Sequence, residues 1–560
     1  MTSRREFLQI AAALAAIVPG GWTRAFAQQR LRQSDIIDLV PFGNVTLVHV
    51  ADLHAQLVPI YFREPTVNIG AGDARGRVPH LTGGALLDFY RIPRGSPAAH
   101  AFSSDDFAAL AKAYGRMGGL DRIATVIAAI RAERGDRVVF LDGGDTWQNS
   151  YTSLLSKGQD MVDCMALLRP DAMVGHWEFT LGTERVKEIV QSLGFPFLAL
   201  NIRDTDWDEP VFLAMTMIER GGVAIAVLGQ AYPYTPIANP RWMVPNWSFG
   251  IREGEVRAQV EKARAAGADL VVLLSHNGFD IDRKLVARVP GIDVVLTAHG
   301  HDALPAVIEV GKTLLVASGS HGKFVSRLDL DVREGAVKGH RYKLMPIFAD
   351  AIAPEPAMAA RIAAVRAPHL KHLDEVLGRA GALLYRRGNF NGTLDDVICD
   401  ALLAERDAEI ALSPGFRWGG SLLEGDAIRR EDIYNATAVT YPAAYRTIMT
   451  GARLKDILED VADNLFNPDP YYQQGGDMVR VGGIACTIDV GQSIGRRISD
   501  LRLLRSGAPL DPAKDYVVAG WASVNEGMQG PPIWDVVAKH VAARQVVTPA
   551  AAGQVRVVGI

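Results

Sequence analysis

Five short segments of the chain carry side chains of the kind that bind metal ions, and each follows an apolar run that predicts a β-strand. A residue at the C-terminal end of a buried strand is held rigidly and faces the crevice where α/β sheets bind ligands. Five such segments, mixing carboxylates and imidazoles, predict a two-metal hydrolase site. The segments are Asp52-Leu53-His54, Gly144-Asp145, Gly175-His176-Trp177-Glu178, His276-Asn277 and His299-Gly300-His301.

These segments can supply one centre for two ions, whereas any one of the histidines alone would more often be a core or surface residue. A carboxylate can bridge two cations and an imidazole cannot, so Asp145 is the predicted bridging ligand. Two ions about 3.5–4 Å apart would activate a water for in-line attack on a tetrahedral centre. The seven predicted ligands are Asp52, His54, Asp145, His176, His276, His299 and His301.

The local spacing suggests how these ligands face the ions. Asp52 and His54 are alternate residues, as are His299 and His301, and alternate residues of an extended segment face the same side. The pair Gly143-Gly144 allows the backbone to turn closely past an ion.

The residues between Val45 and about Phe348 alternate apolar runs with longer segments of helical spacing, a pattern typical of an α/β layered domain. The expected strands are Val45–Val50, Arg137–Leu141, Phe195–Leu200, Val223–Leu228, Asp269–Leu274, Asp293–Thr297 and Thr313–Ala317. The expected helices include Gly119–Arg134 and Arg252–Gly267.

A chain of 560 residues is too long for one hydrophobic core, so two folded domains are expected. We expect a metal-binding domain over 28–350, with an insertion rich in Gly, Pro and Arg at 61–113. A connecting helix is expected over 351–377. The domain at 378–560 has no cluster of metal ligands and is expected to shape the substrate site.

The first 27 residues predict an export signal rather than part of the fold. A twin-arginine motif (Ser3-Arg4-Arg5-Glu6-Phe7-Leu8) precedes an apolar run from Ile10 to Pro19 and a small-x-small cleavage site at Ala25-Phe26-Ala27. The alternative is a membrane anchor, but the run is shorter than the ~20 residues that span a bilayer. We therefore expect twin-arginine export to the bacterial periplasm.

Composition excludes several other classes. The net charge of −4 gives no indication of bulk nucleic-acid or membrane-surface binding. The three cysteines, Cys164, Cys399 and Cys486, form no CxxC pair, so a cysteine metal site or a disulfide framework is not expected. They are expected to be buried thiols. We expect no nucleic-acid partner, no membrane insertion and a monomer.

The order Asp-x-His, Gly-Asp, Gly-[Asn/His]-x-Glu, His, His-x-His resembles the calcineurin-like metallophosphoesterases. With the second domain, nearly the whole mature chain resembles the periplasmic 5′-nucleotidase family. The resemblance implies a four-layer αββα metal domain and an α+β C-terminal substrate domain joined by a helical linker. It also implies one ion bound by Asp52, His54, Asp145 and His301 and another bound by Asp145, His176, His276 and His299.

The third segment departs from the nucleotidase pattern Gly-Asn-His-Glu. His176 stands where nucleotidases have a ligand Asn, and Trp177 stands where they have the catalytic His. An indole cannot shuttle a proton and offers one weak donor. Ester hydrolysis expels an alkoxide and gains from a nearby acid, whereas a thiolate or persulfide leaves with less help.

The segment Gly175–Thr180 (Gly-His-Trp-Glu-Phe-Thr) resembles the thiosulfohydrolases of the bacterial sulfur-oxidising system, and Tyr114–Gly119, Ser413–Gly419 and Gly475–Gly483 are also similar to that family. The resemblance implies two manganese ions, although the ligands also suit zinc or iron. It implies a SoxYZ-type sulfur-carrier protein as partner, with an S-sulfonate on its C-terminal cysteine. Sulfate would leave and the sulfane sulfur would stay on the carrier.

Arg417 lies where nucleotidases place a phosphate-binding Arg, and a guanidinium fork suits a sulfonate as well as a phosphate; the alternative is a surface ion pair. We predict Asp145, Trp177 and Arg417 as catalytic residues and Arg417, Asp477 and Tyr472 as substrate-binding residues. The neighbouring tyrosines at 471 and 472 either line a peptide channel or are simply packed.

Two other functions stay open. A 5′-nucleotidase or cyclic nucleotide phosphodiesterase is the first, and Trp177 argues against it, as does Gln529 at a position where nucleotidases have an aromatic residue that stacks on the base. A periplasmic metal- or anion-binding protein without catalytic activity is the second.

Overall fold

The computed structural model describes residues 31–549 and 554–559, so the predicted export signal at 1–27 lies outside the described residues. The chain forms two compact units. The first contains the described residues up to Tyr61, Gly83–Gln148 and Leu155–Ala367; the second contains Phe62–Thr82, Asn149–Leu154 and the described residues from Pro368 onward. Within the described part of the chain, no helix has both the length and the apolar character needed to cross a bilayer.

Two β-sheets form the centre of the first unit. The five-stranded sheet has the order β13 (Ala336–Pro346), β12 (Phe324–Arg333), β1 (Val45–Val50), β2 (Val138–Asp142) and β3 (Ala172–Met173). The six-stranded sheet has the order β10 (Ile308–Val310), β11 (Thr313–Ala317), β9 (Val294–Thr297), β8 (Leu270–Ser275), β6 (Val223–Gln230) and β5 (Met215–Arg220). β1, β2 and β3 are parallel, as are β6, β8, β9 and β11, so the carboxyl ends of the strands in each run lie at one edge.

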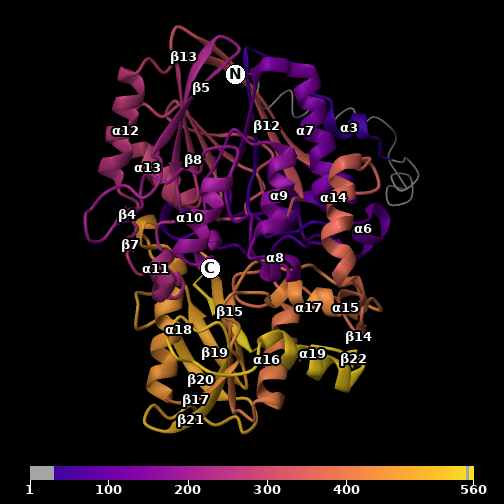
Figure 1. The fold of residues 1–560 in the computed structure, drawn as a ribbon. Helices are drawn as coiled ribbons and strands as arrows, with labels where there is room; N and C mark the ends of the chain where they lie inside the picture. Colours follow the sequence, from indigo (N-terminus) through magenta and orange to yellow (C-terminus); the bar gives the residue numbers. More distant parts are fainter. Residues whose placement is uncertain (1–30, 550–553, 560) are drawn as a thin grey trace. The chain divides into compact units, whose positions relative to one another are not determined.

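The two sheets pack face to face through apolar side chains. Leu47 and Val139 from the first sheet join Val227, Val272 and Leu296 from the second in one buried core. Helices cover the outer faces: α7 (Leu120–Arg134), α9 (Gln159–Leu168) and α14 (Pro356–Arg366) on one side, α12 (Glu253–Ala265) and α13 (Phe279–Arg288) on the other (Figure 1). This confirms the predicted four-layer αββα arrangement.

Six of the seven expected strands are present within one or two residues, but the strand expected at Phe195–Leu200 is wrong. Phe197 makes a single bridge to Met173 and Leu198 makes another to Leu213, so no continuous ladder forms. Both side chains are fully or almost fully buried. An apolar run reports burial, and here the buried segment is not a strand.

The insertion at 61–113 is divided between the units. Residues 62–82 belong to the second unit, where Asn389 donates from its backbone to the Val67 carbonyl (3.2 Å) and accepts from the backbone of Ile69 (2.5 Å). The rest belongs to the first unit and contains three short helices that the sequence pattern did not indicate. These are α4 (Gly83–Tyr90), α5 (Pro97–Phe102) and α6 (Phe107–Tyr114).

The segment expected to be one connecting helix holds two. α14 (Pro356–Arg366) contacts α7 and α9 of the first unit, and the division between the units falls after Ala367, just before Pro368. A short helix, α15 (Leu370–Leu373), follows, and β14 (Val376–Ala380) has already begun at residue 376. Proline cannot donate the backbone hydrogen bond that would continue the helix, which fits the interruption at this point.

The second unit is an α+β fold. Its four-stranded sheet has the order β17 (Tyr445–Thr450), β21 (Asp515–Gly520), β15 (Ile410–Gly415) and β18 (Asp477–Gly482). Smaller sheets contain β16 (Ala427–Arg429), β14 and β22 (Val546–Val547), and β20 (Ile498–Leu503), β19 (Ile484–Asp489) and β23 (Val555–Val558). The longer helices are α16 (Thr393–Glu405), α17 (Arg430–Thr437), α18 (Gly451–Phe466) and α19 (Ile533–Arg544). All three cysteines are buried free thiols, as expected.

A buried network of charges fastens α16 to β18. Asp395 accepts from Arg386 (2.8 Å) and from Arg480 (3.3 Å), and Arg480 also contacts Asp477 at 3.1 Å. The Asp395 side chain is fully buried, and its ion pairs among the described residues are with these two guanidinium groups, which compensate its charge.

We expect Asp395→Ala to lower the free energy of unfolding by about 3–5 kcal/mol, because it leaves two buried guanidinium groups without their shared carboxylate. A urea titration followed by circular dichroism measures the loss, and hydrogen exchange should locate it in β15 and β18. Asp460→Ala, on the exposed face of α18, is the control and should stay within about 0.5 kcal/mol. A loss below about 1 kcal/mol for Asp395→Ala would contradict the assignment.

Candidate metal centre

The seven predicted ligands converge in the first unit at the carboxyl ends of five strands. Asp52 and His54 follow β1, Asp145 follows β2, His176 follows β3, His276 follows β8, and His299 and His301 follow β9. All seven are buried, none more than 8% exposed. Their ligand atoms fall into two groups that share Asp145: Asp52, His54, Asp145 and His301, and Asp145, His176, His276 and His299.

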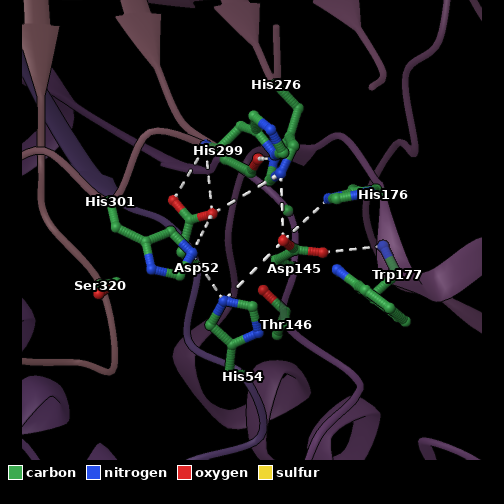
Figure 2. A network of polar contacts seen from close by, with 12 residues as sticks. Asp52, His54, Asp145, Thr146, His176, Trp177, His276, His299, His301 and Ser320 are labelled. Atoms are coloured by element: carbon green, nitrogen blue, oxygen red, sulfur yellow. Dashed lines mark hydrogen bonds and ion pairs between the residues drawn. The ribbon is translucent and has the colours of Figure 1, made fainter. Parts of the chain in front are cut away.

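One oxygen of Asp145 lies at the junction of the two groups. Its Oδ2 is 3.0 Å from His176 Nδ1, 3.3 Å from His276 Nε2 and 3.9 Å from His54 Nε2 (Figure 2). Its other oxygen, Oδ1, accepts the backbone N–H of Trp177 at 2.8 Å. The carboxylate is thus held from one side, with its second oxygen facing ligands of both groups, as a bridging ligand requires.

The group around Asp52 is similarly close. His54 Nε2 and His301 Nε2 face each other at 2.9 Å, and His301 Nε2 is 3.5 Å from Asp52 Oδ1. The backbone N–H of His299 donates to the Asp52 carboxylate at 3.1 Å, which fixes its orientation. Two imidazole nitrogens that face each other can both direct lone pairs at a cation between them and the carboxylates.

The protonation pattern of His276 tests whether these residues fit metal ions. Its Nδ1 faces the Gly143 carbonyl at 2.5 Å, so Nδ1 carries a proton and Nε2 is the ring atom that faces the centre. Among the described residues this buried Nε2 makes no well-aligned hydrogen bond, and Asp145 Oδ2 lies 3.3 Å from it. A buried ring nitrogen placed among carboxylates and further imidazoles fits a divalent cation, so the donor set suits two ions.

The charges of the ligands are coupled. Burial lowers the pKa of His176 to about 4, which leaves its ring neutral at pH 7, as a metal ligand must be. Burial disfavours the Asp145 carboxylate, but His176 and His276 outweigh burial and hold the pKa of Asp145 well below its ordinary value. Burial likewise opposes protonation of His276, yet Asp145 raises its pKa to about 9. A cation at the centre would displace that proton.

The backbone of the ligand loops differs from the extended form expected for the alternate pairs. Asp52, His54, Asp145, His299 and His301 all have positive φ, from 49° to 70°. The two pairs therefore reach the centre through left-handed turns rather than by strand alternation, because the strands end before them. Left-handed backbone is uncommon outside glycine and is tolerated best by Asn, Asp and His. Such strain persists where surrounding contacts fix it, often at functional sites.

Gly144 lies close to the backbone of another loop, and the close approach to an ion that the sequence suggested stays a prediction. Its φ is +86°, and a Cβ placed there would lie 2.8 Å from the Val174 carbonyl oxygen. The turn brings the Asp145 loop against the loop that carries His176.

Glu178 joins these two loops, a role that the sequence did not reveal. It is fully buried; its Oε1 accepts from the Thr146 backbone at 2.6 Å and its Oε2 from the His176 backbone at 2.7 Å. Burial raises the pKa of this carboxyl group. Glu178 therefore positions the backbone on either side of the bridging ligand.

His321 is another residue that the sequence reasoning missed. It is buried, its ring centroid lies 5.1 Å from that of His54, and its backbone donates to the Asp52 carbonyl at 2.8 Å. The signal was present, because His321 follows a buried strand, β11, just as the seven predicted ligands follow strands.

The remaining predicted site residues lie in different surroundings. The Trp177 side chain is buried in the first unit, and Figure 2 shows the indole edge that carries the ring nitrogen turned towards the centre. Arg417 is in the second unit, half-buried, between Phe416 and Trp418, whose rings stack at 4.0 Å. Tyr472 is 66% exposed. Both oxygens of Asp477 already accept hydrogen bonds, from Asn389 and Arg480, which favours a structural role over substrate binding.

We expect Glu178→Gln to weaken metal binding on the order of 10–100-fold. The glutamine amide has one acceptor oxygen, so its N–H would face the backbone N–H of either Thr146 or His176, and the two loops would no longer be joined. Competition with a chelator, followed by elemental analysis, measures the affinity. Glu184→Gln changes a side chain that is 92% exposed and is the matched control. Equal affinities in the two variants would contradict a positioning role for Glu178.

Sequence comparison relates both units to nucleotidases. The family described as 5′-nucleotidase, C-terminal domain, matches residues 373–538. Human 5′-nucleotidase is 24% identical over 450 residues, covering 72% of this chain and 75% of the human protein. A snake venom 5′-nucleotidase from Naja atra is 25% identical over 451 residues, covering 72% of this chain and 83% of its own length.

Comparison with solved structures is more specific. A 5′-nucleotidase precursor from Thermus thermophilus matches with a TM-score of 0.72 over 92% of this chain and 99% of its own, but at 19% identity it shows the fold alone. The sulfate thiohydrolase SoxB of Thermus thermophilus, solved in complex with glycerol, matches with a TM-score of 0.89 and 37% identity over 93% of this chain and 98% of its own. The chain therefore belongs to the SoxB family, within the superfamily of 5′-nucleotidase and calcineurin-like metallophosphoesterase hydrolases.

Proposed function

We propose that this protein is a thiosulfohydrolase that removes sulfate from a cysteine S-sulfonate on a sulfur-carrier protein. The observation that carries the proposal is the third ligand segment, where the metal set is retained but Trp177 replaces the nucleotidase imidazole. The likeness to a sulfate thiohydrolase supports it. The carrier is of the SoxYZ type, and the reaction is a step of periplasmic thiosulfate oxidation after twin-arginine export.

The chemistry is a hydrolysis without net oxidation. Water oxygen forms a bond to the sulfonate sulfur, and the bond from that sulfur to the neighbouring sulfur breaks. The electron pair of the broken bond remains on the carrier's sulfur, which becomes a thiolate. The water protons pass to solvent. Two divalent ions, when bound, would supply a water of low pKa and positive charge for the anionic oxygens; we propose manganese, with zinc and iron as the other candidates.

The protein's own residues position the reaction. Asp145 holds the two ligand groups together through Oδ2 while the Trp177 backbone fixes its Oδ1. The indole offers a single N–H donor and no transferable proton, which is enough for a leaving sulfur that is far less basic than an alkoxide. We propose that Arg417 binds the sulfonate oxygens through its planar fork of donors.

Sulfate release from the sulfonated carrier tests the proposal. With metal-loaded enzyme, ion chromatography should detect sulfate at a kcat/KM well above that for hydrolysis of 5′-AMP. We expect Arg417→Ala to lower kcat/KM by roughly 10- to 150-fold, the equivalent of about 1.5–3 kcal/mol for hydrogen bonds to a charged group. Arg417→Lys should lose less, since it keeps the charge without the fork.

Two results would reject the proposal. Release of no sulfate together with ordinary rates of nucleotide hydrolysis would favour the 5′-nucleotidase alternative. If Asp145→Asn lost metal and the metal-loaded wild-type protein had neither activity, the chain would be a binding protein on this fold.

The role of Trp177 has its own test. In Trp177→His, hydrolysis of 5′-AMP relative to sulfate release should rise by about 10-fold or more, because general acid catalysis is worth roughly 10²–10⁴-fold and one substitution recovers part of it. Trp177→Phe is the control and should not change the ratio in this direction. An unchanged ratio in both variants would show that Trp177 does not set the preference between the two substrates.

A further inference from the structure

Tyr232 packs against the imidazoles of one ligand group. It follows β6, is 1% exposed, and its ring centroid lies 3.9 Å from that of His176 and 4.5 Å from that of His299. The ring of His299 is stacked on it with an interplanar angle of 30°. The third imidazole of this group, His276, meets the same ring edge-on at 6.5 Å. One phenol ring thus contacts every histidine of the group that contains His176.

The other ligand group has a different neighbour. The rings of His54 and His301 lie 4.8 Å apart, and each also contacts His321, at 5.1 and 5.7 Å. The two groups share Asp145 but are packed by separate aromatic residues. A change at Tyr232 can therefore act on one ion more than on the other.

The backbone holds Tyr232 in place between the ligand loops. Its N–H donates to the Gly175 carbonyl at 3.1 Å, next to His176, and the His276 N–H donates to the Gln230 carbonyl at 2.8 Å. Ala231, between Gln230 and Tyr232, is fixed by Asn201, whose side chain accepts from the Ala231 N–H and donates to the Ala231 carbonyl. The segment at the end of β6 is therefore hydrogen-bonded both to the loop that carries His176 and to the loop that carries His276.

An imidazole ligand presents a flat ring on which an aromatic neighbour can pack, as Tyr232 packs on His176 and His299. The final side-chain torsion of His is broad and roughly two-fold, so an unsupported ring can rotate its lone pair away from an ion. Contact with a fixed aromatic face removes that freedom, and groups that orient ligands are typically worth 10–100-fold in metal affinity. His176 occupies the position where nucleotidases have Asn, so the ring-to-ring contact with Tyr232 is specific to an imidazole at this position.

We propose that Tyr232 is a positioning residue for the ion of the Asp145, His176, His276 and His299 group, and that its ring face makes His176 a competent ligand. The inference rests on the two-metal centre and not on the sulfur substrate. The test therefore measures metal binding. If the inference is wrong, the proposed reaction is not affected.

The experiment compares manganese binding by Tyr232→Leu, Tyr232→Phe and the wild-type protein, starting from chelator-treated full-length enzyme. Tyr232→Leu should bind one of two ions on the order of 10–100-fold more weakly. Electron paramagnetic resonance should then show an isolated Mn²⁺ signal where the wild type gives a coupled pair. Tyr232→Phe keeps the ring and should bind two ions. Tyr90→Leu, at a buried tyrosine of α4, is the matched control for loss of aromatic bulk.

A second comparison separates ring support from general stability. In a protein that already carries His176→Asn, adding Tyr232→Leu should weaken binding of the ion of the Asp145, His176, His276 and His299 group. The factor should be smaller than in the wild-type background. If Tyr232→Leu does not fold, Tyr232→Met replaces the ring with a flexible side chain of similar size and carries the same expectation.

Three outcomes would overturn the proposal: unchanged binding of both ions in Tyr232→Leu, an equal loss of both ions, or equal effects in the two backgrounds. Loss of an ion in Tyr232→Phe would also reject it, because the hydroxyl rather than the ring face would then be responsible.

Discussion

The Asp145 carboxylate is the interaction on which the metal centre depends. One of its oxygens is bound by the Trp177 backbone, and the other faces imidazoles of both ligand groups. A carboxylate so close to several imidazoles in a buried site is stable only if positive charge balances it, from protons or from cations. The fold surrounds this point with ligands because the strands that precede them are parallel and end at common sheet edges.

The ligand loops combine strained backbone with supports that hold it. Five ligands have left-handed φ, and loops of this kind would relax without contacts that fix them. Glu178 joins the Asp145 and His176 loops, the Gly143 carbonyl sets the His276 tautomer, and the end of β6 connects the His176 and His276 loops. The centre is therefore a property of several loops together, and a change in one support is expected to reach the ions through the backbone.

The chain keeps a phosphoesterase metal set while altering the groups beside it. His176 retains a ligand where nucleotidases use Asn, and Trp177 removes the imidazole that would assist an alkoxide. In the second unit, Arg417 is flanked in sequence by Phe416 and Trp418, whose rings stack on each other, whereas Asp477 belongs to the buried charge network. Under the proposed function, these differences adapt the scaffold to a tetrahedral sulfur anion whose leaving group needs little help.

The sequence alone determined the layered α/β architecture, most of the strands and all seven residues of the two ligand groups, because strand periodicity and ligands at strand ends are local patterns. It did not determine how those ligands reach the ions. The expected extended pairs are left-handed turns, and the expected strand at Phe195–Leu200 is a buried segment without a ladder. The roles of Glu178, His321 and Tyr232, and the division of the 61–113 insertion between two units, depend on contacts between residues far apart in the chain. Only the tertiary structure decides such contacts, since neither spacing nor composition records which distant side chains share a core.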